Sequence, residues 1–183
     1  MRPHPARHRT IRNKRGIAQA FTGPPQGLVL RRATVFDVFD LSRVLVRSIT
    51  DLCTADHQDD PEVIAQWVAN KDPATIRGWI RNGAQIWLAE NNGQPAAVGG
   101  LTEAGEITLL YIDPDQTGCG IGGVLLKTLE QELIALGCAE GRLEATRTAQ
   151  GFYARHGWEA TGGCSQRNDL SCLSMCKSLH LQD

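Results

Sequence analysis

The sequence predicts one α/β (α+β) domain with a mixed central sheet of about seven strands flanked by helices, preceded by a basic N-terminal tail. Three observations carry this prediction. The chain has 183 residues, enough for one domain, and 42% of them are hydrophobic. Its apolar residues change between the spacing of a strand and that of a helix several times. The resulting order is strand, three helices, three strands, helix, strand, helix and two strands.

The charge distribution divides the chain into a basic tail over residues 1–26 and an acidic domain over residues 27–183. The tail holds six basic residues and no acidic one, so the remainder carries 13 basic and 20 acidic residues, a net charge of −7. An acidic body repels phosphate backbones and anionic lipids, so we expect no nucleic-acid partner and no membrane partner. No apolar stretch has the length or the position of a signal peptide or a membrane span, so we expect a cytoplasmic protein.

The six cysteines are spaced without a paired C-x-x-C motif. A disulfide scaffold of this size would need a denser set, so we expect reduced and mostly buried thiols.

The first half of the chain begins with a strand at residues 28–30, after a glycine and proline cluster at residues 23–27. Apolar residues from Val38 to Leu52 recur every three or four positions, which predicts a helix. Two shorter helices follow within residues 60–82, each with a proline near its start. Residues 85–90 and 96–101 are apolar runs separated by Asn91-Asn92-Gly93, the pattern of a β-hairpin.

The second half begins with a β-rich strand at residues 106–112, which Asp113-Pro114 ends. A glycine-rich loop leads into a helix that starts at Gly122 and ends at Gly137. A strand at residues 142–146, a helix at 148–156 and strands at 158–161 and 170–177 complete the domain.

The loop at residues 117–123 reads Thr-Gly-Cys-Gly-Ile-Gly-Gly, between a strand and a long helix. Four glycines let successive N–H groups converge at the positive end of the helix dipole, an arrangement that binds phosphate. The spacing fits neither a P-loop nor a dinucleotide-binding loop. A tight connection without a ligand is the alternative reading of the loop taken alone.

Three motifs make residues 28–179 resemble the GNAT superfamily of acyl-CoA-dependent N-acetyltransferases. Residues 117–122 match the family's Arg/Gln-x-x-Gly-x-Gly/Ala except at the first position. Thr146, Ala149, Phe152, Tyr153 and Gly157-Trp158 match Asn-x-x-Ala-x-x-Phe-Tyr-x-x-x-Gly-Phe, with Thr146 in place of asparagine and Trp158 in place of phenylalanine. Residues 175–179 resemble the Met-x-Lys of the family's final strand.

The resemblance implies acetyl-CoA as cosubstrate. The pyrophosphate would lie on the N–H groups of the loop, and the pantetheine arm would pair with the backbone of the strand before it. Thr117 and Cys119 stand where basic or amide residues are frequent, so backbone donors would carry the phosphate, with Arg155 as a possible helper. The cofactor-binding residues expected on this basis are Leu110, Tyr111, Ile112, Thr117, Gly118, Cys119, Gly120, Ile121, Gly122, Gly123, Thr146 and Phe152.

The resemblance also implies catalytic roles. Tyr153 corresponds to the general acid that protonates the leaving thiolate, and its alternative reading is a buried aromatic. Glu106 is a candidate base for the ammonium acceptor, and its alternative reading is a solvated strand end. The expected acceptor-binding residues are Cys53, Asp56, His57 and Trp67. They lie in the segment from Asp51 to Trp67, which contains four aspartates and would therefore suit a cationic amine. A solvated polar loop is the alternative reading of this segment. Cys53 and His57 are spaced like a pair of metal ligands, but the sequence offers no third ligand, so we assign no metal site.

Two functions follow from these residues. The first is an N-acetyltransferase that passes acetyl directly from acetyl-CoA to an amine of a small molecule or a protein, without a metal. The second is a non-catalytic acyl-CoA-binding regulatory or interaction module, because Thr117, Cys119 and Thr146 depart from the family pattern. A homodimer is possible in either case.

Overall fold

The computed structural model describes residues 25–167 and 170–180, with side chains described except at residues 164–171. The predicted basic tail therefore lies almost entirely outside the described residues. The strands are β1 (Leu28–Arg32), β2 (Gln85–Asn91), β3 (Gln94–Leu101), β4 (Glu106–Ile112), β5 (Glu140–Ala145), β6 (Glu159–Arg167) and β7 (Leu170–Ser178). The helices are α1 (Val38–Leu52), α2 (Thr54–His57), α3 (Pro61–Val68), α4 (Pro73–Arg81), α5 (Ile121–Ala135) and α6 (Arg147–Arg155), with a 3-10 turn at Pro114–Gln116.

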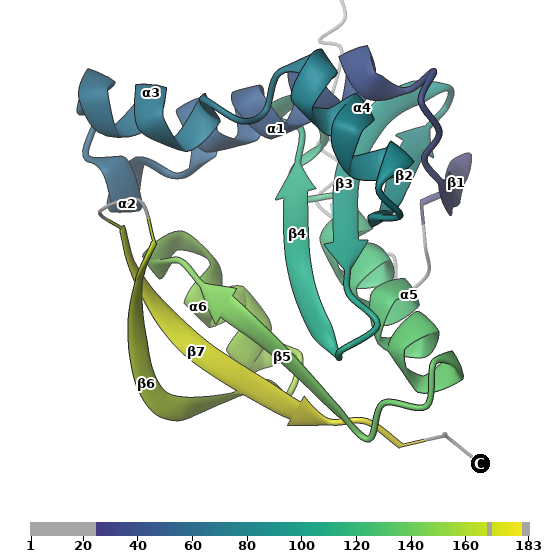
Figure 1. The fold of residues 1–183 in the computed structure, drawn as a ribbon, viewed down its shortest axis with the longest axis vertical. Helices are drawn as coiled ribbons and strands as arrows, with labels where there is room; N and C mark the ends of the chain where they lie inside the picture. Colours follow the sequence, from purple (N-terminus) through teal and green to yellow (C-terminus); the bar gives the residue numbers. More distant parts are fainter. Residues whose placement is uncertain (1–24, 168–169, 181–183) are drawn as a thin grey trace, which may run out of the picture.

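One mixed sheet joins all seven strands in the order β1-β2-β3-β4-β5-β7-β6, which confirms the predicted fold class. Every neighbouring pair is antiparallel except β4 and β5, which run parallel (Figure 1). Parallel neighbours need a crossover connection, and α5 supplies it between these two strands. Strand direction therefore alternates across the sheet except at this pair, where it is kept.

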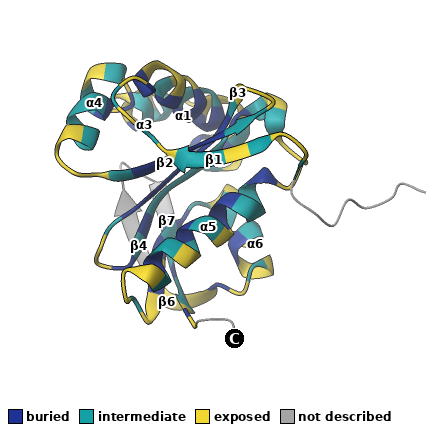
Figure 2. Cartoon of the chain, turned by 90° about the vertical axis from the view of Figure 1, so that its right-hand side faces the viewer, coloured by how far each residue is buried: buried dark blue, intermediate teal, exposed yellow. Residues whose placement is uncertain are grey.

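Alternating side chains of β2 and β3 divide the core between the two faces of the sheet, as the period of a strand requires. Ile86, Leu88 and Val98 pack against α1 and α4. Trp87, Ala89 and Ala97 pack against α5 on the other face. Figure 2 shows the buried faces of α1 and α5 turned toward the sheet between them. The apolar stripes that predicted these helices are thus the surfaces that bury them.

A glycine permits the close contact of α5 with β3. A Cβ added to Gly99 would lie 3.0 Å from the Cδ1 atoms of Leu125 and Leu129. A larger residue at this position would push α5 off the sheet and move the start of the helix, which adjoins the candidate site.

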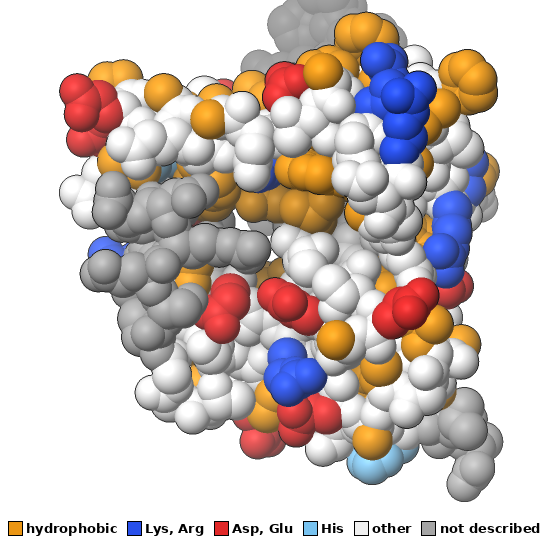
Figure 3. Space-filling model, viewed as in Figure 1, with side chains coloured by type: hydrophobic (Ala, Val, Ile, Leu, Met, Phe, Trp, Pro, Cys, Tyr) orange, Lys and Arg blue, Asp and Glu red, His pale blue; other side chains and the backbone are white. Residues whose placement is uncertain are grey.

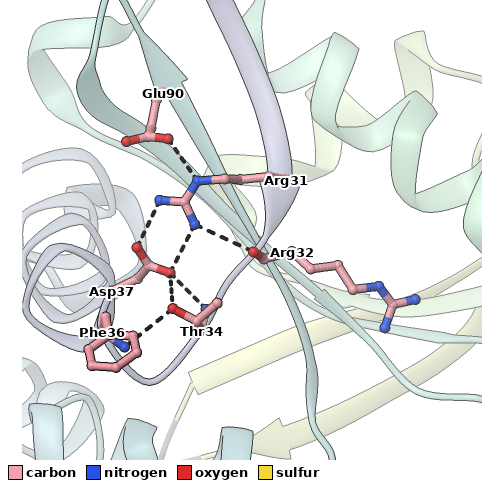
Figure 4. A network of polar contacts seen from close by, with 6 residues as sticks. All are labelled: Arg31, Arg32, Thr34, Phe36, Asp37 and Glu90. Carbon is pink, nitrogen blue, oxygen red and sulfur yellow. Dashed lines mark hydrogen bonds and ion pairs between the residues drawn. The ribbon is translucent and has the colours of Figure 1, made fainter.

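An ion-pair network fixes the start of α1 against the sheet edge (Figure 4). The Arg31 guanidinium donates to Asp37 at 2.8 and 2.9 Å and to Glu90 at 2.9 Å. Asp37 also accepts from the N–H and hydroxyl of Thr34 at 2.7 and 2.9 Å. The Arg31 hydrogen bonds, with those from Thr34, lower the pKa of Asp37 to about 2 despite partial burial. The carboxylate therefore stays ionised and holds β1, β2 and α1 together.

Three features differ from the sequence-based expectations. The segment expected to be a loop after Leu52 contains the short helix α2 (Thr54–His57), and β6 runs to Arg167 rather than ending at residue 161. The expectation of mostly buried thiols is wrong for the described cysteines, because Cys119 is exposed, Cys138 and Cys176 are partly exposed, and only Cys53 and Cys172 are buried. All five are free thiols. Cys119 and Cys138 lie in loops, and Cys176 lies on β7, so periodicity alone did not place them.

Candidate functional site

A cavity of about 210 Å³ opens where β4 and β5 separate. Among the described residues these strands pair only at Glu106 with Arg142 and at Ile107 with Leu143. Beyond Ile107, the β5-facing edge of β4 therefore has backbone N–H and C=O groups available to an extended ligand. The lining comprises Ser48, Leu52, Cys53, Trp67, Ile107, Thr108, Leu109, Leu110, Tyr111, Ile112, Gly122, Glu144, Thr146, Thr148, Ala149, Phe152 and Tyr153.

The glycine loop reaches this cavity at Gly122. Gly118 and Gly120 have φ values of +75° and +78°, a left-handed conformation that favours glycine. Gly120 is the N-cap of α5, and no described side chain caps the helix there. The first intrahelical bond of α5 runs from Val124 N to Gly120 O, so the N–H groups of residues 121–123 have no intrahelical partner. The loop therefore presents free backbone donors beside the cavity.

The side chains of the loop contribute little to the cavity itself. Thr117 Oγ1 donates to Pro114 O at 3.1 Å, and Cys119 Sγ donates to Thr117 O at 3.5 Å. Ile121 is buried in the core. Of the cofactor-binding residues expected from sequence, the cavity lining includes Leu110, Tyr111, Ile112, Gly122, Thr146 and Phe152, and does not include Thr117, Gly118, Cys119, Gly120, Ile121 or Gly123.

Tyr153 lies on α6 and lines the cavity with its ring almost fully buried, at 6% exposure. Trp158 and Phe152 pack edge-on against it, with ring centroids 6.0 and 5.3 Å away. Burial raises the pKa of the Tyr153 phenol well above its usual value, with a smaller contribution from Tyr111. The phenol therefore remains protonated across the physiological pH range and is a proton donor held in a fixed position.

Two of the four acceptor-binding residues expected from sequence also line the cavity. Trp67 comes from α3, and Cys53 from the end of α1. The Cys53 thiol contacts Ser48 O at 3.6 Å, and burial raises its pKa to about 12, with a smaller contribution from Asp56. Cys53 is therefore an uncharged thiol at neutral pH rather than an activated nucleophile.

The other two, Asp56 and His57, lie outside the cavity lining, so the structure does not support the contacts expected for them. Asp56 accepts hydrogen bonds from Arg147 N at 2.6 Å, Thr148 N at 3.2 Å and Thr148 Oγ1 at 2.6 Å. His57 is 1% exposed, with Nε2 3.1 Å from Ile49 O and Nδ1 accepting from Asp59 N at 3.0 Å. Both side chains therefore make hydrogen bonds within the protein.

Two carboxylates near the paired ends of β4 and β5 occupy different positions. Glu106, the base expected from sequence, is absent from the lining of this cavity and lies in a separate hollow beside Arg142. Glu144 on β5 lines both the hollow and the cavity. Its Oε1 accepts a hydrogen bond from Ser174 Oγ at 2.8 Å. Glu144 was missed because the divergence of β4 from β5, which exposes it to the cavity, has no local sequence signal.

A second cavity, of about 400 Å³, adjoins the first. It is bounded by α3, α4 and the loop between them on one side and by β2 to β4 on the other. The two cavities share Trp67, Thr108, Leu109 and Tyr111. In the part of the chain that the structure describes, no group of three or more His, Cys, Asp or Glu residues is arranged to hold a metal ion. Nor does any helix of these residues have the length and apolarity to cross a membrane.

Comparison with known proteins agrees with this geometry. A family model described as an acetyltransferase (GNAT) domain matches residues 53–179. The chain is 30% identical over 127 residues to the uncharacterized N-acetyltransferase YafP of Escherichia coli K12, covering 67% of this chain and 75% of that protein. A solved GCN5-related N-acetyltransferase from Rhodopseudomonas palustris superposes with a TM-score of 0.75 at 27% identity, covering 86% of this chain and 97% of the other. The PaiA N-acetyltransferase of Thermoplasma acidophilum, solved with coenzyme A, shares the fold with a TM-score of 0.66 at 18% identity, covering 82% and 98%.

Proposed function

Because the chain belongs to the GNAT acetyltransferase family, we propose that it transfers the acetyl group of acetyl-CoA to an amine of a small molecule or protein. The observation that carries the proposal is the cavity between β4 and β5, which joins an unpaired strand edge, the open N-terminus of α5 and a buried phenol. The strand edge suits the amide-bearing pantetheine arm, and the free N–H groups of residues 121–123 suit the pyrophosphate.

The proposed reaction is a direct transfer. The neutral amine attacks the thioester carbonyl carbon, and a C–N bond forms. When the tetrahedral intermediate collapses, the C–S bond breaks and Tyr153 donates its proton to the leaving sulfur. Its raised pKa keeps the phenol protonated until that moment. Backbone N–H groups of β4 near Leu110 are the proposed donors to the oxyanion.

The proton released by the acceptor needs a base, and the two carboxylates offer a direct comparison. We assign the base to Glu144 rather than Glu106 because Glu144 lines the cavity. If so, Glu144→Gln lowers kcat most at low pH, where the ammonium form of the acceptor dominates. Glu106→Gln is the matched control, and an equal or larger loss in that variant would return the role to Glu106.

The test of the proposed function is chromatographic measurement of CoA formed from acetyl-CoA across an amine panel. We expect amine-dependent CoA, matched by an acetylated product, and a loss of about 10²-fold or more in kcat for Tyr153→Phe. Tyr111→Phe serves as the comparison, because Tyr111 is the other of the chain's two tyrosines and lines the same cavity. Equal rates in wild type and Tyr153→Phe would remove the acid role.

A second candidate, an acyl-CoA-binding module without turnover, rests on the composition of the loop. Residues 117–123 contain no cationic side chain, so phosphate binding would depend on backbone donors alone. Saturable acetyl-CoA binding without CoA release for any amine would favour this candidate. The cytoplasmic location and the homodimer stay predictions.

A further inference from the structure

The second cavity lies beside the proposed transfer site and has four lining residues in common with it. Trp67, Thr108, Leu109 and Tyr111 line both spaces, so the two cavities adjoin along these residues. Figure 3 shows a hollow with hydrophobic side chains on its floor beneath the layer of helices α1, α3 and α4. Its volume of about 400 Å³ is within the range of small-molecule sites.

The walls of the second cavity combine aromatic rings with one buried cation. Trp67, Trp79 and Tyr111 supply the aromatic surface. Of the described residues in the lining, Lys71 alone carries a charge, and it is only 7% exposed. Its Nζ lies 5.5 Å from the centroid of the Trp79 ring and contacts the amide oxygen of Asn70. The ammonium group is thus held in place inside the protein, where a nearby anion interacts with it more strongly than in water.

The backbone fixes the position of this lysine. α3 ends at Val68, and Lys71 N donates to Val68 O at 2.9 Å. The next residue, Asp72, caps α4 by accepting from Ala74 N at 2.9 Å and Thr75 N at 3.0 Å. The backbone of Lys71 therefore belongs to a short turn tied at both ends, and its side chain is buried beside the cavity.

Two of the four aspartates between Asp51 and Trp67 that would suit a cationic acceptor form helix caps instead. Asp56 caps α6, and Asp60 caps α3 by accepting from Glu62 N at 2.8 Å. Neither lines the second cavity. An acceptor with further positive charge, such as a polyamine or the side chain of a peptidyl lysine, would bring its cation toward Lys71.

We propose that the second cavity binds the acceptor, and that the acceptor is a small amine carrying a carboxylate or similar anionic group on an apolar body. The anionic group pairs with Lys71, the apolar body packs against Trp67 and Trp79, and the amine faces the shared wall at Tyr111. This inference rests on the proposed acetyl transfer and narrows its substrate class.

The test compares matched amines that differ only in the carboxylate: phenylalanine with 2-phenylethylamine, and leucine with 3-methylbutylamine. Spermidine and a lysine peptide complete the panel. We expect kcat/KM to be about 10- to 100-fold higher for each carboxylate-bearing amine, which is the range for a hydrogen bond between charged groups. Lys71→Met should abolish this preference, mainly through KM, whereas Lys71→Arg should retain it. The KM for acetyl-CoA should not change in either variant.

Three results would overturn the inference: equal or better use of the amines without carboxylate, a preference for spermidine or the lysine peptide, or an equal loss for both members of each pair in Lys71→Met. The last would identify Lys71 as a structural residue. If no amine supports CoA release, the proposed transfer fails, and the inference is then tested by binding. Tryptophan fluorescence would be titrated with N-acetylphenylalanine and with N-acetyl-2-phenylethylamine. Tighter binding of the anionic compound, lost in Lys71→Met, would support the site without turnover, and equal binding would reject it.

Discussion

The N-termini of α5 and α6 both lie beside the cavity between β4 and β5, yet the protein treats them in opposite ways. The start of α5 has a glycine at its N-cap and no capping side chain among the described residues. The start of α6 is occupied by the Asp56 carboxylate, which accepts from two backbone N–H groups and one hydroxyl there. Asp56 lies 91 residues before Arg147, so this cap joins distant parts of the chain.

A helix N-terminus attracts an anion whether the anion belongs to the protein or to a ligand. At α6 the anion is the protein's own, and it fixes the helix that holds Tyr153. At α5 the donors stay open, as a phosphate site requires. The comparison therefore separates a helix end capped by the protein's own carboxylate from one whose N–H groups no side chain caps among the described residues, although both ends have the same electrostatic character.

The largest expected effect comes from closing the open end. Gly120→Val places a β-branched residue at a φ of +78°, which costs about 1–3 kcal/mol of strain and would turn the N–H groups of the loop away. We expect the KM for acetyl-CoA to rise by about 100-fold, the equivalent of roughly 2.7 kcal/mol. Steady-state kinetics with varied acetyl-CoA measures this change.

Gly137→Val is the matched control, because Gly137 follows the other end of α5 with a φ of +84°. A Cβ at either glycine meets no atom within 4 Å, so both variants introduce strain without a clash. If both raise the KM for acetyl-CoA equally, the effect belongs to the stability of α5 and not to its open N-terminus.

Removing the carboxylate that caps α6 should have a smaller effect than the change at Gly120. Asp56→Ala removes a cap and should lower the free energy of unfolding by about 1–2 kcal/mol, as measured by urea denaturation. Because Tyr153 is on the released helix, kcat should fall as well. Asp72→Ala removes the comparable cap of α4 and should destabilise the protein without altering the KM for acetyl-CoA. An unchanged kcat in folded Asp56→Ala would show that the cap does not position Tyr153.

An intermediate effect is expected from giving α5 an anion of its own. Cys119→Asp adds a carboxylate to an exposed loop position. It should raise the KM for acetyl-CoA by roughly 3- to 10-fold at low salt, and less at high salt because surface charges are screened. Cys119→Asn has nearly the same shape without the charge, so an equal rise in that variant would assign the effect to the shape of the side chain.

The smallest effect concerns Asp37, a carboxylate used by the fold at the start of α1. Its pKa of about 2 lies below the unfolded value, so its contribution to stability is present above about pH 4 and disappears as the pH falls toward 2. Arg31→Met should lower the free energy of unfolding by about 1 kcal/mol at pH 7, a value reduced for solvent exposure of the arginine, and by much less at pH 2.

Denaturation at a series of pH values measures this difference. Arg32→Met is the control, because Arg32 is the next residue on the same strand but pairs with Glu132 at 3.2 Å and stacks on Trp87 at 4.5 Å instead of pairing with Asp37. A loss in Arg31→Met that stays constant from pH 7 to pH 2 would contradict the assignment to Asp37.

The sequence predicted those parts of the fold that depend on local patterns. The apolar stripes of α1 and α5, the hairpin between β2 and β3 and the glycine loop could all be predicted because side-chain period and turn chemistry are local properties. The family motifs also directed attention to Tyr153, which does line the cavity. In contrast, His57 and Asp56 looked like ligand-binding residues because their partners, Ile49 O and the start of α6, cannot be identified from spacing.

By itself, the sequence determined the order of the strands and of the longer helices, the apolar faces of those helices and the glycine-rich start of α5. The tertiary structure alone decided which polar groups remain available to a ligand. It closed the N-terminus of α6 with Asp56, turned Glu144 toward the cavity and left Lys71 beside Trp79. The physical reason is that burial follows a short repeat along the chain, whereas a hydrogen-bond partner is selected by proximity in space, often between residues far apart in sequence.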